Sequence, residues 1–284
     1  MSHLPVPKTY KLYIGGKFPR SESGRVYEVT SAKGEFLANA AKASRKDARD
    51  AVVAARAAFG GWSGTTPYNR GQVLYRIAEL LEGRSAQFAE ELRLTDGVSA
   101  AAAQRQVEEA IDTWVWYAGW ADKYVQVAGN GNPVAGPFFN ISTPEPTGVV
   151  AVIAPEADGL LGLVSVIAPA IVSGNTVVVV ASEKSPLSAV TLSEVLATSD
   201  VPGGVVNVLT GSAAEIAPWL ASHADVNALD LAGAENLDWV DLQIAAAETL
   251  KRVLPPENGS PARSLPRITF FTETKTVWHT KALI

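Results

Sequence analysis

Four runs of mostly apolar residues, each followed by a helical segment, most constrain the fold of this 284-residue chain. The runs are VVAVIA (149–154), TVVVVA (176–181), VVNVLT (205–210) and NALDLAG (227–233). Buried strands that alternate with helices are typical of a parallel sheet covered on both faces. We therefore predict an α/β fold with a doubly wound parallel sheet, and we expect any ligand at the carboxyl ends of its strands.

The segments between and after these strands are predicted to be helical. The expected helices cover 160–172, 186–197, 213–223 and the stretch from the fourth strand to about Val253. Asp230 is the one charged residue that this pattern places inside a core strand.

The first half of the chain predicts a small strand layer and then four helices. The strand layer covers residues 10–40, with a turn at Gly15-Gly16. The helices are expected after the N-cap Ser44, from Thr66-Pro67 to about Glu82, over 86–95 and over 102–126.

Three aromatic residues share one face of the last of these helices. They are Trp116, Trp120 and Tyr124, at i, i+4 and i+8. We interpret this stripe as core or subunit interface rather than as a surface on which a ligand stacks.

Composition argues against several classes of function. The chain has no cysteine, which excludes disulfides, thiolate metal sites and a cysteine nucleophile. His3, His223 and His279 are too scattered in sequence to indicate a metal site. The net charge is -5 without a basic block, so nucleic acid is not an expected partner. We see neither a signal region nor an apolar run long enough for a membrane span, and we expect a cytoplasmic protein without membrane contact.

Eight short motifs resemble, in order, those of aldehyde dehydrogenases. They are LYIGGKF with SGRVYEV, WYAGWADK, EPTGVVAVIAP, APAIVSGNTVVV, SPLSA, VPGGVVNVLTG with HADVN, ETLKRV and TETKTVW. The resemblance implies a Rossmann-like nucleotide-binding domain formed by residues 1–136 and 147–253. It also implies a β oligomerisation arm formed by 137–146 and 269–284. Residues 254–268 are then a connector in place of the family's catalytic domain.

The same resemblance implies a mechanism for which this chain lacks the residues. In the family a cysteine thiolate attacks an aldehyde, hydride passes to NAD(P), and a glutamate activates water. Here there is no cysteine, and Ala157 stands in the place of the oxyanion asparagine. Pro256 aligns with the glutamate; Glu257, one position away, is interpreted as a solvated loop residue, with a catalytic part as the alternative. We assign no catalytic residue and lean against an enzyme, with a residual aldehyde oxidoreductase as the alternative.

The cofactor contacts that the resemblance implies are also reduced. Glu183 and Gly233 remain, and we interpret both as vestigial. Val180 replaces a lysine that contacts the adenosine ribose. At the helix that faces the pyrophosphate, Glu235 and Asp238 add carboxylates, which satisfy N–H groups and repel phosphate. We expect no bound cofactor, with weak NAD or NADP binding as the alternative.

The two segments of the predicted arm are retained. Residues 137–146 are interpreted as a β-hairpin, and the β-branched and aromatic run from Thr269 as the strand associated with it. The predicted oligomerisation residues are Phe139, Ile141, Phe270, Thr272, Thr274, Thr276 and Trp278.

The resemblance also implies a partner. In the family these segments extend the sheet of a neighbouring subunit's catalytic domain, and this chain has the donor segments without the acceptor domain. We therefore expect strand addition to a full-length aldehyde dehydrogenase, with this chain as its structural or regulatory subunit. Self-association and an NAD(P)-binding regulator are the alternatives.

Overall fold

A five-stranded parallel sheet forms the centre of the molecule. The structure is a computed structural model that describes residues 6–281. The strand order is β7-β6-β5-β8-β9. The strands are β5 (Val149–Ile153), β6 (Thr176–Val180), β7 (Val206–Leu209), β8 (Ala228–Asp230) and β9 (Arg252–Leu254). Every residue of β5 to β8 is buried, so the four predicted strands and the doubly wound α/β class are confirmed.

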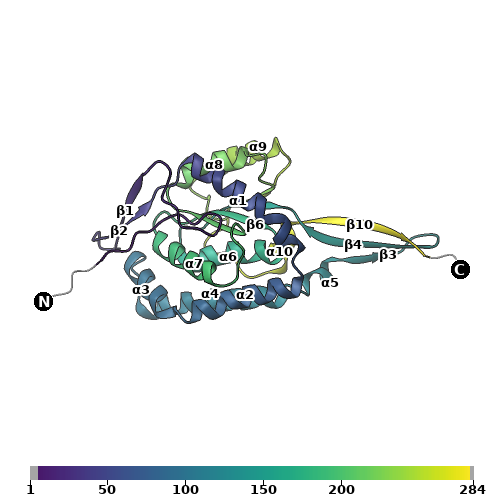
Figure 1. Ribbon diagram of the computed structural model, residues 1–284, viewed down its shortest axis with the longest axis horizontal. Coiled ribbons are helices and arrows are strands. Elements are labelled where there is room, and N and C mark those ends of the chain that lie inside the picture. The colour runs from purple at the N-terminus through teal and green to yellow at the C-terminus, as the bar shows by residue number, and fades with distance from the viewer. Residues whose placement is uncertain (1–5, 282–284) are drawn as a thin grey trace.

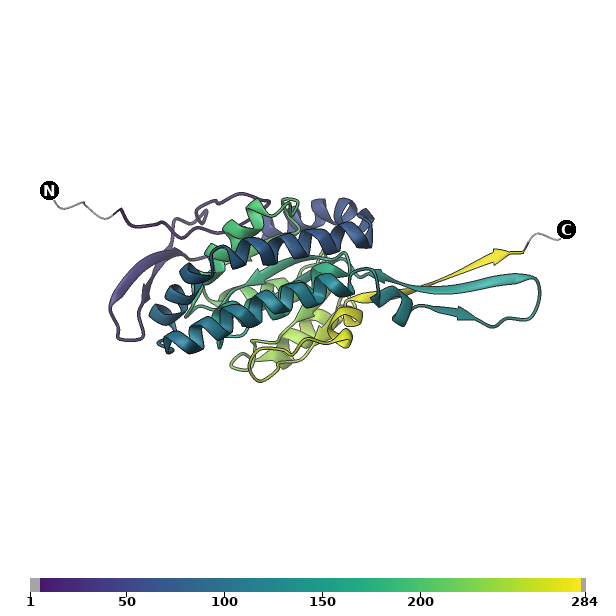
Figure 2. The same ribbon diagram turned by 90° about the horizontal axis from the view of Figure 1, so that it is seen from below.

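Helices cover both faces of this sheet (Figures 1 and 2). One face carries α6 (Gly159–Val172) and α7 (Pro186–Thr198), with α2 (Pro67–Glu82), α3 (Ser85–Thr95) and α4 (Ala100–Trp120) packed against them. The other carries α1 (Arg45–Gly64), α8 (Ala213–Ser222) and α9 (Trp239–Ala247). Successive strand residues point to opposite faces, so Val179 enters the first core and Val178 the second. No helix within residues 6–281 has the length and apolarity needed to cross a bilayer.

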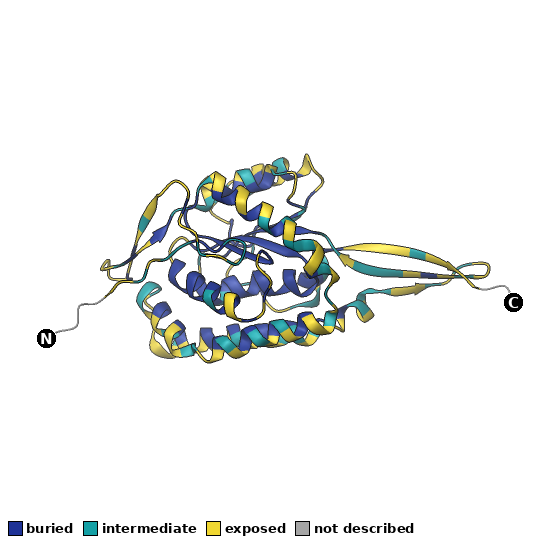
Figure 3. Ribbon diagram, in the orientation of Figure 1, coloured by how far each residue is buried: buried dark blue, intermediate teal, exposed yellow. Residues whose placement is uncertain are grey.

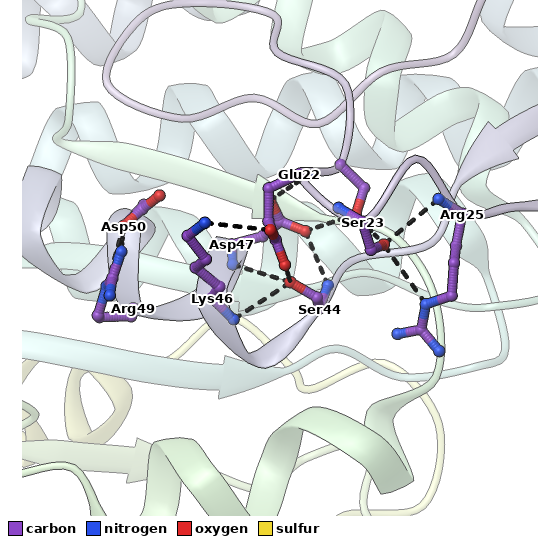
Figure 4. Close-up of polar contacts among 9 residues, drawn as sticks. Glu22, Ser23, Arg25, Ser44, Lys46, Asp47, Arg49 and Asp50 are labelled. Carbon is purple, nitrogen blue, oxygen red and sulfur yellow. Dashed lines mark hydrogen bonds and ion pairs between the residues drawn. The ribbon is translucent and has the colours of Figure 1, made fainter.

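The first helix begins at the predicted N-cap, Ser44 (Figure 4). The Ser44 side chain accepts from the backbone N–H of Asp47 at 3.2 Å, and the Asp47 carboxylate accepts from the Ser44 N–H at 2.8 Å. This reciprocal capping box satisfies two N–H groups of the helix start. The buried Asp47 also accepts from Ser21 Oγ at 2.7 Å, which fixes the N-terminal segment to α1.

The predicted N-terminal strand layer is confirmed and is small. It consists of β1 (Val26–Thr30) paired antiparallel with β2 (Phe36–Ala41). Upstream of it, the backbone of Tyr13 exchanges two hydrogen bonds with Val208, at 2.9 and 2.8 Å. This bridge occupies the outer edge of β7 at that position.

The long helix predicted over 102–126 is in fact two helices. It ends at Trp120, and a short α5 (Tyr124–Ala128) follows a turn. Tyr124 is buried, as expected for a core residue. Trp116 and Trp120 are half-buried at the margin of the core, and their ring centroids lie 5.7 Å apart.

The helix predicted to run to Val253 is also shorter than expected. It stops at Ala247, and Leu250 takes a left-handed backbone conformation (φ 55°) that ends the helical path. The chain then forms β9, whose Arg252 N–H donates to Asn227 O at 3.3 Å. The sequence did not predict this strand, which is three residues long and, unlike β8, only half-buried.

A three-stranded arm projects from the body (Figures 1 and 2). It contains β3 (Asn130–Asn132), β4 (Phe138–Pro146) and β10 (Thr272–Thr280), in the order β10-β4-β3. Unlike the central sheet, it is mostly half-buried or exposed (Figure 3). Residues 137–146 therefore supply one strand, not a hairpin, and the hairpin is formed by β3 with β4.

The predicted boundaries of the arm and the connector change accordingly. Thr269 and Phe270 belong to a short helix, α10 (Leu265–Phe270), and not to the strand, which begins at Thr272. The irregular connector is confined to residues 255–264 because Leu254 belongs to β9. The predicted arm residues 282–284 and the N-terminal residues 1–5, with His3, lie outside the described residues.

Candidate functional site

Three loops meet at the carboxyl edge of the sheet, where doubly wound folds bind their ligands. They follow the adjacent strands β5, β6 and β8 and cover residues 154–158, 181–185 and 231–238. The positions assigned to a cofactor, Val180, Glu183, Gly233 and Asp238, lie on these loops or at a strand end. The structure thus brings the predicted residues to one edge.

The loop after β6 is occupied by a carboxylate from the loop after β5. Glu156 Oε2 accepts from Ser182 Oγ at 2.8 Å, and Glu156 Oε1 accepts from the backbone N–H of Glu183 at 3.1 Å. The N–H of Lys184 adds a longer bond of 3.4 Å to Oε2. Glu183 therefore contributes its backbone to an internal contact, while its side chain is at an exposed position.

Val180, at the position where the resemblance places a lysine, is part of the core. Val180 is 1% exposed and packs in the cluster beneath α1 and α8. An apolar side chain there offers no hydrogen bond to a ribose. A lysine-to-ligand contact of this type contributes about 1.5–3 kcal/mol, so its loss weakens a nucleotide site substantially.

Gly233 has a packing role that needs no cofactor. Its N–H donates to Ile153 O at 2.9 Å, which joins the β8 loop to the end of β5. A Cβ built on Gly233 would lie 2.0 Å from Ala154 O, far inside van der Waals contact. Close approach of the two backbones explains why glycine stands here.

The N-terminus of α9 is closed by its own acidic residues. The Asp238 side chain is the N-cap and accepts from the Asp241 N–H at 3.4 Å. Both residues also line a cavity of about 300 Å³ between α8 and α9, whose other walls include Leu237, Leu242 and Pro218. The cavity has apolar walls and two carboxylates at this helix start, which opposes binding of a phosphate.

A buried ion-pair network closes the edge at β8. Asp230 is fully buried, and its carboxylate pairs with the guanidinium of Arg267 from α10. Arg267 also pairs with Glu257 of the connector, at 2.5 Å. Burial raises the pKa of the Asp230 carboxyl, an effect that the Arg267 charge and the Ala232 N–H oppose.

This network revises one expectation from the sequence and adds one residue that the sequence did not indicate. Glu257 is not a freely solvated loop residue, because it is bonded to Arg267. Arg267 was not among the residues predicted from the sequence. The signal that could have found it is Asp230 itself, since a buried carboxylate in a strand requires a cationic or hydrogen-bonding partner elsewhere.

The connector makes a second contact with the edge through Asp158. This residue precedes α6 in a left-handed conformation (φ 53°). Its carboxylate accepts from Ser260 Oγ at 3.1 Å and from Gln106 Nε2 at 3.4 Å. The connector is therefore bonded to the loop after β5 and, through the Glu257 N–H to Ala232 O at 3.3 Å, to the loop after β8. Ala157, in the loop after β5, offers no side-chain donor for an oxyanion.

The arm has a very different surface. β10 is its outer strand, and within residues 6–281 only one edge of β10 is paired. The pairing register is flanked by hydrogen bonds from Lys281 N to Pro137 O (2.8 Å) and from Thr147 N to Phe271 O (3.1 Å). Hydrogen-bonded and non-hydrogen-bonded pairs alternate along an antiparallel ladder. The odd-numbered residues of β10 thus bond to β4, and the even-numbered ones direct their N–H and C=O groups to the open edge.

The predicted oligomerisation residues divide between this edge and the two faces of the arm. The backbone groups of Thr272, Thr274, Thr276 and Trp278 point to the open edge. Phe139 and Ile141 lie together on one face and are 57% and 42% exposed. The Trp278 side chain lies on the opposite face, edge-on to Phe138 at 5.8 Å. Phe270 is half-buried against the main core and is not on the arm surface.

Comparison with known proteins gives the family. A sequence profile described as "Aldehyde dehydrogenase family" matches residues 18–256. The chain is 33% identical over 263 residues to a putative aldehyde dehydrogenase, DhaS, of Bacillus subtilis, covering 91% of this chain and 52% of that protein. It is 35% identical over 251 residues to retinal dehydrogenase 2 of Gallus gallus, covering 87% of this chain and 48% of the relative.

Solved structures agree with this result. HpcC from Thermus thermophilus superposes with a TM-score of 0.82 and 32% identity, over 87% of this chain and 48% of HpcC. The chain belongs to the aldehyde dehydrogenase family. It spans about half the length of the relatives that it matches.

Proposed function

We propose that this chain is a catalytically inactive aldehyde-dehydrogenase-like subunit that donates β10 to a full-length aldehyde dehydrogenase in a hetero-oligomer. Its role there is structural or regulatory, and its proposed location is the cytoplasm. The observation that carries the proposal is the open edge of β10, a nine-residue strand. An unpaired strand edge is a template for pairing with another chain.

The central sheet of this chain is a poor acceptor for such a strand. Its edge at β9 is three residues long, against nine in β10. The other edge, at β7, is bridged by Tyr13. Self-association through β10 and a central-sheet edge would leave most of the donated strand unpaired, which favours a different partner.

Catalytic inactivity is proposed from the chemistry of the carboxyl edge. The chain has no cysteine for the nucleophile. Glu257, the residue nearest to the general-base position, is held by Arg267. The purified chain should therefore form no NADH or NADPH when mixed with NAD or NADP and an aldehyde. Aldehyde-dependent turnover above a heat-denatured control would instead support the alternative, a residual oxidoreductase.

The partner proposal is tested by co-expression. The chain and a full-length aldehyde dehydrogenase of the same organism should elute together in size-exclusion chromatography. Separate elution of the two proteins would reject the proposal. Elution of this chain alone as a dimer or larger species would support self-association instead.

The contribution of the β10 edge is tested by Thr276→Pro. Proline removes an N–H that faces the open edge and is tolerated on edge strands. We expect co-elution with the partner to be lost while the bonds between β10 and β4 remain. The matched control is Thr276→Ala, which loses the 2.8 Å contact with Ser142 Oγ but keeps the N–H. Equal behaviour of the two variants would show that this edge is not the interface.

A second candidate function, an NAD(P)-binding regulator, is favoured by the cavity between α8 and α9. Its apolar walls could take a planar ring, although Asp238 and Asp241 oppose the phosphates. Calorimetry with NADH and NADPH separates the candidates. Heat of binding at micromolar ligand would favour the regulator, and no heat at millimolar ligand would exclude it.

A further inference from the structure

We propose that the Glu156 carboxylate is an internal occupant of an anion site, and that this contact keeps phosphate and carboxylate ligands away from the loop after β6. The site is the turn formed by Ser182, Glu183 and Lys184. This inference concerns the isolated chain and does not depend on the partner of the arm.

The donors of the turn converge on one carboxylate. The Ser182 hydroxyl lies 2.8 Å from Glu156 Oε2, and the Glu183 N–H lies 3.1 Å from Oε1. Lys184 adds its N–H at 3.4 Å. A hydroxyl and successive backbone N–H groups directed at one point are the donors that bind phosphate and carboxylate oxygens in proteins.

The turn is held in place by contacts that do not involve Glu156. Ser185 N donates to Ser182 Oγ at 3.1 Å, and Ser185 Oγ bonds to Asp96. Just upstream, Ala181 N donates to Leu209 O at 2.9 Å. Ser182 is buried. We therefore expect the donors to keep their positions when the carboxylate is removed.

The occupant comes from a partly exposed loop. Glu156 is half-buried, and the next two residues, Ala157 and Asp158, are exposed. A carboxylate tethered this close has a high effective concentration at the turn, so a free anion competes with it poorly. Withdrawal of Glu156 would leave the site open.

The test is Glu156→Ala with inorganic phosphate as the probe. Backbone amide NMR signals of Glu183 and Lys184 report the site directly. In the variant they should move on titration with millimolar phosphate, and the apparent affinity should be at least about tenfold higher than in the native chain. Parallel titration with NADH shows whether the anion can belong to a dinucleotide, in which case NADH binds more tightly than phosphate.

Two further variants keep the result interpretable. Glu183→Gln removes a neighbouring charge but leaves Glu156 in the turn. The backbone amide signals of the turn in this variant should therefore stay as insensitive to phosphate as those of the native chain. Glu156→Gln keeps the side-chain length and should give a smaller gain than alanine. A native chain that responds to phosphate as strongly as Glu156→Ala would overturn the proposal. So would an alanine variant that keeps its dispersed spectrum and shows no response.

Discussion

The carboxyl edge of the central sheet and the outer edge of the arm differ in what fills them. At the carboxyl edge the chain's own side chains take the polar positions: Glu156 holds the turn after β6, and Asp238 caps α9. At the arm, the outward backbone groups of β10 have no partner within residues 6–281. The carboxyl edge is thus closed by the chain's own residues, and the outer edge of the arm is left open.

The Asp230–Arg267 pair links the central sheet to α10, the helix that follows the connector. Here a fully buried carboxylate in β8 meets an arginine 37 residues later in the chain. The pair therefore ties α10 to the carboxyl end of β8.

The largest expected effect on stability follows from breaking this pair. Arg267→Met leaves Asp230 buried without a counter-ion, and such removal costs about 3–5 kcal/mol. Denaturant unfolding monitored by far-UV circular dichroism measures the loss. In the double variant Asp230→Val/Arg267→Met, most of that stability should return, because apolar residues can replace a buried pair at little cost.

The double variant decides between two origins of the effect. If Arg267→Met and the double variant are equally unstable, then Arg267 acts through its bond with Glu257 or through packing, and not through Asp230. If the single variant is as stable as the native chain, the carboxyl edge is not held by this pair.

A smaller effect is expected from Gly233→Ala. The added Cβ would lie 2.0 Å from Ala154 O, so the two loops must separate. Overpacking of this type costs about 1–3 kcal/mol. The control in the arm is Gly131→Ala, where nothing lies within 4 Å of the new Cβ. That variant should change stability by no more than about 0.5 kcal/mol.

The Gly233→Ala variant also distinguishes a packing role of the glycine from a role in binding a cofactor. If Gly233→Ala unfolds at the same denaturant concentration as the native chain, the glycine is not required for packing. Its retention would then have to be explained by a ligand.

Much of the fold could be predicted from the sequence because its signals are local. The β-branched runs define β5, β6 and β7, and Ser44 defines the start of α1. The errors lie where a long-range contact or a single backbone angle decides the structure. Leu250 leaves the helical conformation, and β9 is defined by its parallel pairing with β8.

For the site, the sequence predicted only which of the family's functional residues are absent. Comparison of motifs identified Val180, Ala157 and Asp238 as departures from the family. It could not show what occupies the space that they leave, because Glu156 and Arg267 reach their partners across separate loops. The sequence predicted a strand with an edge free for pairing. That Ile141 and Trp278 lie on opposite faces of the arm could be seen only from the pairing register of β10 with β4.

The smallest expected effect concerns an exposed ion pair at the root of the arm, the counterpart of the buried pair at the carboxyl edge. Arg252 of β9 forms two hydrogen bonds with Glu273 of β10, at 2.6 and 2.7 Å. Both side chains are well exposed, so Glu273→Gln should cost about 0.2–1 kcal/mol at neutral pH and low salt. Urea unfolding of the two proteins at pH 7 measures it.

The pH dependence of this difference has a definite sign. The hydrogen bond from Arg252 lowers the pKa of Glu273 below its ordinary value of 4.5. The stabilisation is therefore present above pH 4.5 and is lost as the pH falls through the lowered value.

Glu273 also lies directly opposite Glu145 in the register, and like charges so placed repel each other. Arg252→Met should consequently cost more than Glu273→Gln, because it leaves that repulsion uncompensated. The reverse order would mean that Arg252 contributes through its pairing alone and that Lys275, 2.9 Å from Glu145, already neutralises the opposing charge.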